Sequence, residues 1–137
     1  MVLFDTNILV YANDNRDPRK QDIAMRLLER HARSRDGMVA MQTLHEFANV
    51  LLNKLHREPA DIAGRIRVYS SVFGVIDSSV AKLTRALEIH AFCKISIWDA
   101  LIVAAAEAGG CDTILSEDLN DGQRYCGILA QNPFAVK

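Results

Sequence analysis

Short apolar runs alternate along this chain with longer segments of helical periodicity, and no other feature of the sequence constrains the fold as strongly. The apolar runs predict strands at 2–4, 38–41, 75–76, 112–116 and 127–130. Between them, apolar residues recur three and four positions apart, which is typical of helices that bury one face. Strands separated by helices pair in parallel, with helices on both faces of the sheet. The sequence therefore predicts an α/β fold with a central, mainly parallel sheet of about five short strands.

Local signals predict where the helices begin and end. The aspartate–proline pair at 17–18 is a capped helix start, and Gly37 is expected to end that helix. Thr43 is expected to start the next long helix, and Asp77 or Ser78 to cap a later one. The expected helices cover about 6–12, 18–36, 43–57, 59–72, 79–92 and 97–108.

The totals describe one ordinary globular domain. A length of 137 residues fits a single domain over 1–137, and the net charge of −1 gives no bulk attraction for nucleic acid, although it leaves room for a local basic patch. Cys93, Cys111 and Cys126 lack metal-ligand spacing and are typical of reduced thiols in a cytoplasmic protein. With no secretory signal and no run of 18 apolar residues, we expect no membrane span.

Four acidic residues lie where the predicted strands end or the following helices begin. Asp5 comes directly after the first strand, and Asp118 follows the fourth. Glu46 and Asp99 lie in the first turns of two helices. Because the carboxyl ends of parallel strands meet at the same edge of a sheet, we expect the four carboxylates to lie close together.

Clustered carboxylates require compensation. Two unit charges about 4 Å apart repel by about 1 kcal/mol in water and by several times more near a protein surface. Either protonation of one group or a bound divalent cation offsets this repulsion. Oxygen-only ligands suit Mg²⁺ or Mn²⁺, and such an ion can activate water and stabilise charge on a phosphodiester. The sequence thus predicts a magnesium site, with manganese as the alternative.

Each acid also has a purely structural interpretation. The segments 43–46 and 96–99 match the capping box, in which a hydroxyl and an acid satisfy the first N–H groups of a helix. Asp5 suits the cap of the helix at 6–12, and Asp118 suits a turn. The joint placement at one sheet edge favours the metal site, because independent caps would not all fall there.

Four segments of the chain together resemble a known family. They are FDTNILVYA, TLHEFANVL, SIWDALIVAAAEAGGCDTILSEDL and the closing NPF, and they are similar to the PIN domain, in particular to VapC-type toxins of toxin–antitoxin pairs. The resemblance covers essentially the whole chain. It implies a three-layer α/β/α PIN-like fold and a metal-dependent endoribonuclease that hydrolyses RNA phosphodiester bonds with a metal-activated water. It also implies a cognate antitoxin and a homodimer.

The resemblance assigns roles to the residues that match its motifs. Asp5, Glu46 and Asp99 resemble metal-binding catalytic acids, and Asp118 resembles the fourth. The surrounding polar residues would orient acids or water; they are Thr6, Asn7, Ser116 and Asp121. One ambiguity stays open at this point, because Glu117 and Asp121 flank Asp118 and either could share or replace its role.

Other conspicuous residues have simpler interpretations. The basic segment 16–35 could steer phosphates, but a solvated helix face is favoured. The four histidines lack zinc-site spacing, and His45 lies on a different helix face from Glu46. We expect Trp98 and the apolar stripes on 44–55 and 83–92 to belong to the core, although part of the helix pair at 43–72 could instead form a dimer or antitoxin surface.

Three alternative functions compete with the toxin. A phosphohydrolase with Asp5 as nucleophile requires an aspartate two positions later, where Asn7 stands, and a late lysine that 110–125 lacks. A catalytically silent PIN-like binding module would not need the intact acid set. A PIN nuclease of RNA maturation outside a toxin pair keeps the chemistry, but the chain has no extra nucleic-acid module.

Overall fold

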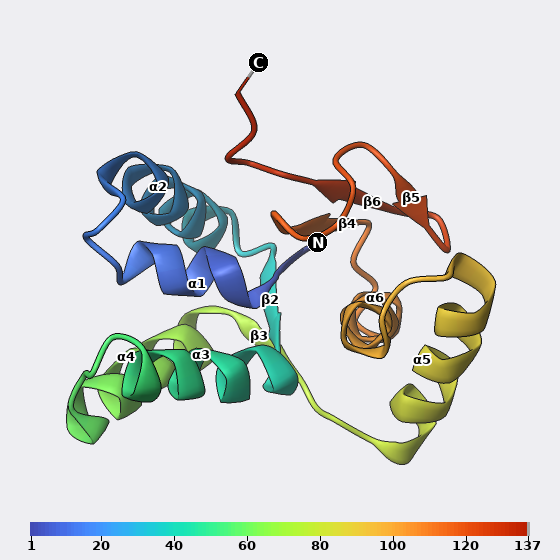
Figure 1. Ribbon diagram of the computed structural model, residues 1–137, viewed down its shortest axis with the longest axis horizontal. Coiled ribbons are helices and arrows are strands. Elements are labelled where there is room, and N and C mark those ends of the chain that lie inside the picture. The colour runs from blue at the N-terminus through green and yellow to red at the C-terminus, as the bar shows by residue number, and fades with distance from the viewer. Residues whose placement is uncertain (137) are drawn as a thin grey trace.

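A six-stranded sheet separates two groups of helices in the computed structural model, which describes residues 1–136 (Figure 1). The strand order is β3-β2-β1-β4-β6-β5, and every pairing is parallel except that of β5 with β6. This confirms the predicted α/β fold. The strands are β1 (Val2–Phe4), β2 (Gly37–Ala40), β3 (Gly74–Ile76), β4 (Thr113–Leu115), β5 (Arg124–Tyr125) and β6 (Ile128–Gln131).

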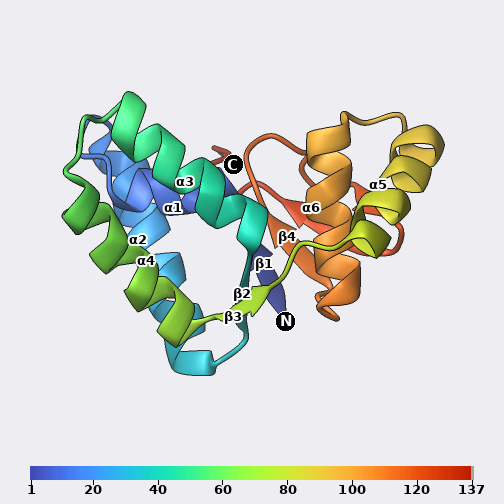
Figure 2. The ribbon, with the colours of Figure 1, turned by 90° about the horizontal axis from the view of Figure 1, so that it is seen from below.

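The helices flank the sheet unequally (Figure 2). One side carries α1 (Thr6–Ala12), α2 (Pro18–Ser34), α3 (Met41–Asn53) and α4 (Pro59–Val72), and the other carries α5 (Val80–Cys93) and α6 (Ile97–Ala108). No single helix within residues 1–136 is long and apolar enough to cross a membrane; α5 and α6 pass only as a pair that bends by 116°.

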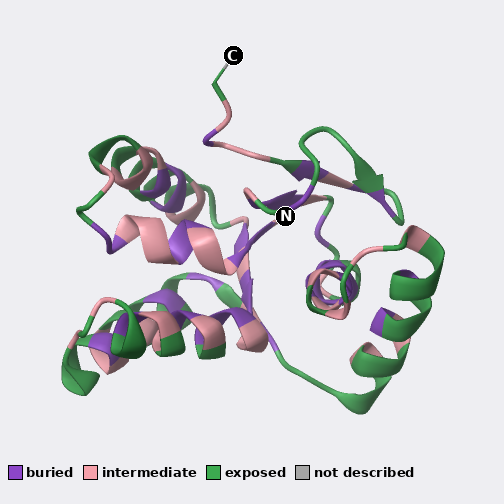
Figure 3. Cartoon of the chain, in the orientation of Figure 1, coloured by how far each residue is buried: buried purple, intermediate pink, exposed green. Residues whose placement is uncertain are grey.

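Alternate residues of each strand belong to two separate hydrophobic clusters. Leu3 and Ile114 pack with α5 and α6, whereas their neighbours Phe4 and Leu115 pack with α1 to α4. Because successive side chains of a strand point to opposite faces, each apolar strand is buried on both sides. Figure 3 shows this burial concentrated along the sheet and the inner faces of the helices.

The prediction that Gly37 ends the first long helix is wrong. That helix, α2, ends at Ser34, and Arg35 adopts the left-handed conformation that closes it. Gly37 instead opens β2, where a Cβ atom would lie 2.7 Å from ring atoms of both Phe4 and Phe73. The glycine is therefore required by close packing between layers rather than by a helix end.

Two predicted helix starts are also wrong. The helix α3 begins at Met41 with no side-chain cap, so Thr43 lies inside the helix, where it is buried and its hydroxyl has no hydrogen-bond partner. The capping box at 43–46 therefore does not form, and α3 ends at Asn53 rather than near 57. Ser79, not Asp77 or Ser78, caps α5.

The antiparallel strand β5 has no counterpart in the sequence prediction. It is two residues long and joins β6 through Cys126 and Gly127, whose φ angles are 52° and 82°. Two consecutive positive φ values are the signature of a tight hairpin turn. The predicted strand at 127–130 therefore begins one residue later, at Ile128.

Part of the expected core lies at the surface instead. Trp98 is 66% exposed, and Leu83, Leu87 and Phe92 on α5 are all exposed. Trp98 and Leu83 line a cavity of about 550 Å³ between α3, α5 and α6, to which Glu46 also contributes. Helical periodicity identifies an apolar face but does not show whether it packs within the chain or against a partner.

Candidate active site

The register of two neighbouring strands brings Asp5 and Ser116 together. Phe4 of β1 is paired with Leu115 of β4, so the next residue of each strand emerges at the same edge of the sheet. Ser116 Oγ donates a hydrogen bond of 2.7 Å to Asp5 Oδ2, and the backbone N–H of Thr6 donates one of 2.7 Å to Oδ1. Asp5 and Ser116 are both buried. The carboxylate is thus fixed at the start of α1, whose N-cap it also forms.

Thr6 connects this carboxylate to Glu46. Its hydroxyl donates a hydrogen bond of 2.8 Å to Glu46 Oε2, across 40 positions of sequence. Gln42, one helical turn earlier on α3, donates to the other carboxylate oxygen at 2.7 Å. Both oxygens of Glu46 are therefore held by neutral donors from two different helices.

Asn7 connects the same motif to Asp118. Its Nδ2 donates to Asp118 Oδ2 at 3.2 Å, while its Oδ1 accepts from the backbone N–H of Glu117 at 3.4 Å. The backbone N–H of Asp118 in turn donates to Ser116 Oγ at 3.0 Å. The segment that follows β4 is therefore tied to the start of α1 at several points.

Asp99 completes the group from α6. Ser96 caps this helix and accepts a hydrogen bond of 3.1 Å from the backbone N–H of Asp99, as the capping-box pattern predicts for the serine. Burial raises the pKa of Asp99, and the charges of Asp118 and Glu46 raise it further. The charge of Asp99 is therefore coupled to those of Asp118 and Glu46.

The cluster carries negative charge that the chain does not neutralise. Burial is the main cause that raises the pKa of Asp5 from 3.8 to about 6, and the charges of Asp118 and Glu46 add to it. Hydrogen bonds from Ser116 and from the backbone of Thr6 act in the opposite direction but do not prevail. Within residues 1–136, no ion pair with a basic side chain involves any of the four acids.

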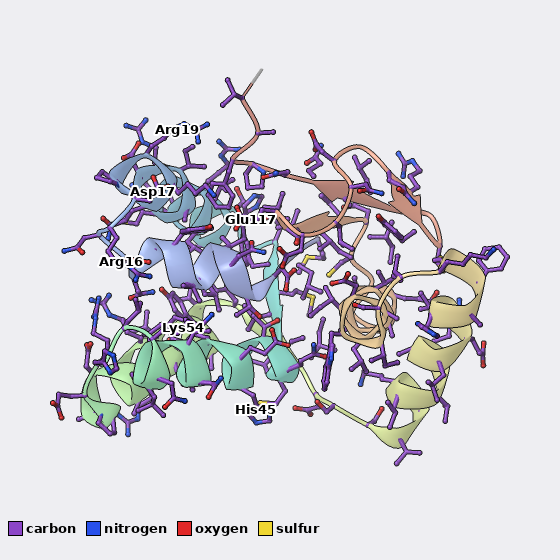
Figure 4. All side chains as sticks on the ribbon, viewed as in Figure 1. Arg16, Asp17, Arg19, His45, Lys54 and Glu117 are labelled. Carbon is purple, nitrogen blue, oxygen red and sulfur yellow. The ribbon has the colours of Figure 1, made fainter. Side chains whose placement is uncertain are left out.

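The two acids that flank Asp118 point elsewhere. Glu117 accepts hydrogen bonds from Tyr11 and Lys20, and it lies between α1, α2 and the sheet (Figure 4). Asp121 accepts a hydrogen bond of 2.9 Å from the backbone N–H of Asn132. Its expected contribution to the site stays a prediction.

Three residues around the site were not predicted from the sequence. Gln42 binds Glu46 from four positions earlier, a spacing that places two side chains on one helix face and could have identified it. Tyr11 and Lys20 bind Glu117 from two helices, and only the tertiary structure shows that contact.

The donor set of the cluster fits a hard divalent cation. All its ligand atoms are carboxylate oxygens, which Mg²⁺ and Mn²⁺ prefer, and the four acids have no cationic partner among residues 1–136. The carboxylates do not form a preassembled cage, since no three acidic, histidine or cysteine side chains in the described chain are close enough to hold one ion. The chemistry of the donors, rather than a finished coordination shell, supports a cation here.

Comparison with known families identifies the fold. The chain matches the model of the PIN domain over residues 2–124, so it belongs to the PIN domain family. A comparison with curated protein sequences finds no significant match.

Several solved structures of similar fold are toxins or toxin–antitoxin complexes. A toxin–antitoxin complex from Klebsiella pneumoniae contains a chain 23% identical to this one, with a TM-score of 0.70 and coverage of 99% of this chain and 100% of that chain. VapBC2 from Rickettsia felis, bound to a promoter DNA fragment, gives 19% identity, a TM-score of 0.68 and coverage of 96% and 98%. VapC20 of Mycobacterium tuberculosis, a toxin that cleaves the sarcin–ricin loop, is 21% identical to this chain with a TM-score of 0.64. The match covers 83% of this chain and 87% of that chain. At these identities the likeness establishes the shared fold.

Proposed function

We propose that this protein is a metal-dependent endoribonuclease and the toxin of a toxin–antitoxin pair. The observation that carries the proposal is a set of four carboxylates near one sheet edge, of which Asp5, Glu46 and Asp118 are held by neutral donors and none has a basic partner in residues 1–136. Membership of the PIN domain family and the structural likeness to an RNA-cleaving toxin support the reaction class, and the likeness to a toxin–antitoxin complex supports the pairing.

Each residue of the cluster has a proposed role. Asp5, Glu46, Asp99 and Asp118 would hold Mg²⁺ or Mn²⁺. When bound, such an ion lowers the pKa of water and stabilises negative charge on the phosphodiester. Thr6 and Ser116 keep the carboxylates of Glu46 and Asp5 oriented, and Asn7 does so for Asp118. Below about pH 6, where the Asp5 carboxyl keeps its proton, that proton would be released when a cation binds.

The proposal includes a second copy of the chain. The exposed apolar residues beside the cavity, Val80, Leu83 and Trp98, are suited to an interface next to the acids. Light scattering on the wild type should give the mass of a dimer, and Leu83→Asp should reduce it to that of a monomer. Val68→Asp, on the exposed face of α4, is the matched control and should stay dimeric. A monomeric wild type would contradict this part of the proposal.

The proposal also includes a cognate antitoxin. An antitoxin that inhibits cleavage would be expected to cover the acidic cleft and to supply the basic side chain that the cluster lacks. Co-expression with the product of the adjacent reading frame, followed by co-purification and loss of cleavage, would test this partner.

The nuclease activity has a direct test. Purified protein, freed of any partner, is incubated with total tRNA and structured RNAs in Mg²⁺, in Mn²⁺ and in EDTA. We expect cleavage with either metal, none in EDTA, and none by Asp5→Asn. Asp22→Asn is the matched control, because Asp22 is exposed on α2 and lies outside the cluster. Undiminished cleavage by Asp5→Asn would show that the site is assigned wrongly, and a folded protein that binds Mn²⁺ without cutting any RNA would favour the silent binding module.

A further inference from the structure

Glu117 makes a set of contacts beside the acid cluster that the proposed reaction does not use. Lys20 Nζ lies 2.8 Å from Glu117 Oε2, and the Tyr11 hydroxyl donates a hydrogen bond of 2.6 Å to Oε1. Lys20 also donates to the Tyr11 hydroxyl at 3.1 Å. The three side chains thus form a closed triangle, in which each one is hydrogen-bonded to the other two.

This triangle holds the segment that carries two residues of the site. Ser116 and Asp118 direct their side chains to Asp5 and Asn7, whereas Glu117, between them, directs its side chain to α1 and α2. The chain bends at 117–119, and the backbone N–H of Asp118 donates a hydrogen bond of 3.0 Å to Ser116 Oγ within this bend. Anchoring the side chain of Glu117 therefore restrains the backbone from which the side chains of Ser116 and Asp118 extend.

The C-terminal segment covers the triangle. Phe134 is buried, and its ring lies 5.0 Å from that of Tyr11. Lys20 Nζ lies 4.6 Å from the centre of the Tyr11 ring and 5.6 Å from that of Phe134. The side chains of Lys20 and Glu117 are consequently only 26% and 24% exposed. An ion pair that is screened from water and held by a third group is worth more than an exposed surface pair.

We propose that Lys20, together with Tyr11, is a positioning residue for the metal site. It acts through Glu117, holding Ser116 and Asp118 in the orientation that cation binding requires. The inference rests on the proposed function, since it concerns the same site. It also explains why Glu117, although adjacent to Asp118, belongs to the support of the site rather than to its ligands.

The test compares Mn²⁺ binding and the Mn²⁺ dependence of RNA cleavage in variants of this triangle. In Lys20→Met we expect the Mn²⁺ dissociation constant, measured by calorimetry without RNA, to rise by about tenfold, the lower end of the effect of losing a partner of a metal ligand. The Mn²⁺ concentration for half-maximal cleavage should rise equally. Saturating Mn²⁺ should restore the maximal rate, and KM for RNA should not change.

Three further variants make the test specific. Lys20→Arg keeps the charge and should recover most of the Mn²⁺ affinity. Tyr11→Phe keeps the ring packing while losing the hydroxyl, so it should weaken Mn²⁺ binding less than Lys20→Met, and it replaces that variant if Lys20→Met does not fold. Arg26→Met, which removes an exposed ion pair with Asp22 on the same helix, should match the wild type.

The outcomes separate the two proposals. Wild-type Mn²⁺ affinity in both Lys20→Met and Tyr11→Phe, with cleavage intact, would overturn the positioning role and leave the nuclease standing. A loss of cleavage that saturating Mn²⁺ does not restore, or a raised KM for RNA, would also overturn it. A wild type that binds no Mn²⁺ and cuts no RNA would overturn both.

Discussion

Two aspartates are buried in the described part of the chain, and their carboxylates differ in their hydrogen-bond partners and in the direction of their pKa shifts. Asp5 is 6% exposed and Asp14 is 7% exposed. Hydrogen bonds from Arg16 hold the pKa of Asp14 below its usual range, whereas burial raises that of Asp5 to about 6. Asp14 receives its compensating charge from the chain, and Asp5 receives only neutral donors, Ser116 and the backbone of Thr6.

The difference indicates which carboxylate is structural and which is functional. A buried charge is stable when it is paired, and a fold that pairs the buried Asp14 with Arg16 is able to do so. The cluster around Asp5 lacks such a partner in residues 1–136. We expect the missing charge to come from outside the chain, as a divalent cation and, in the proposed complex, as a basic group of an antitoxin.

The largest expected effect comes from exchanging the two aspartates for asparagine. Asp5→Asn should reduce RNA cleavage by at least about 100-fold, since losing even a neighbour of a metal ligand costs about 10- to 100-fold. Asp14→Asn should leave the cleavage rate within about twofold but lower the free energy of unfolding by about 1–2 kcal/mol, because it weakens hydrogen bonds to a charged group. RNA cleavage assays and urea unfolding of both variants test this prediction. Equal loss of activity in both variants would remove the distinction between them.

The pH dependence of stability should separate Asp5 from its asparagine variant. Native Asp5 keeps its proton up to about pH 6, whereas the unfolded chain loses it near 3.8, so the native state binds more protons in that window. Stability therefore falls as the pH rises through it, by up to about 3 kcal/mol. In EDTA, Asp5→Asn should gain about this much relative to the wild type between pH 4 and pH 8. Urea unfolding measures it, and a difference that does not change with pH would contradict the raised pKa.

Two threonines provide a finer version of the same comparison. Thr6 donates its hydroxyl to Glu46, so Thr6→Val should lower the cleavage rate by about tenfold, as expected for a partner of a metal ligand. The melting temperature should change little, because Thr6 is only half-buried. Metal titration of the cleavage rate would show whether the loss comes from weaker cation binding; an unchanged rate would mean that Thr6 does not orient Glu46.

Thr43 should show the smallest effect, a modest gain in stability without a change in cleavage. Its hydroxyl is fully buried without a hydrogen-bond partner. Thr43→Val replaces it with a methyl group of similar shape and should raise the free energy of unfolding by about 1 kcal/mol, with cleavage unchanged. A destabilised Thr43→Val would show that the hydroxyl has a partner after all.

The sequence was sufficient to predict the mainly parallel sheet and the position of Asp5 at its edge. Apolar runs separated by helices leave few topologies, and a parallel sheet places Asp5 and Ser116 side by side once β1 and β4 are neighbours. The capping-box pattern at 96–99 also predicted that Ser96 caps α6. These features follow from local patterns combined with one topological rule.

Other features depend on contacts between distant segments. The direction of Glu117 is set by Tyr11 and Lys20, about 100 positions away in the sequence, and no local pattern reports it. The start of α3 at Met41 overrides the cap signal of Thr43, because packing buries that threonine. The apolar face of α5 has the same periodicity as a core helix, so sequence reasoning assigned it to the core.

Mn²⁺ binding at pH 7.5 by the wild type and by Asp5→Asn, both stripped with EDTA, tests the central claim most directly. Titration calorimetry on the wild type should show saturable binding, since at this pH Asp5, whose pKa is about 6, is already largely ionised and available to a cation. The variant should bind at least about tenfold more weakly. Equal binding by the two proteins, or none by the wild type, would contradict the claim that the uncompensated carboxylates around Asp5 form a cation site.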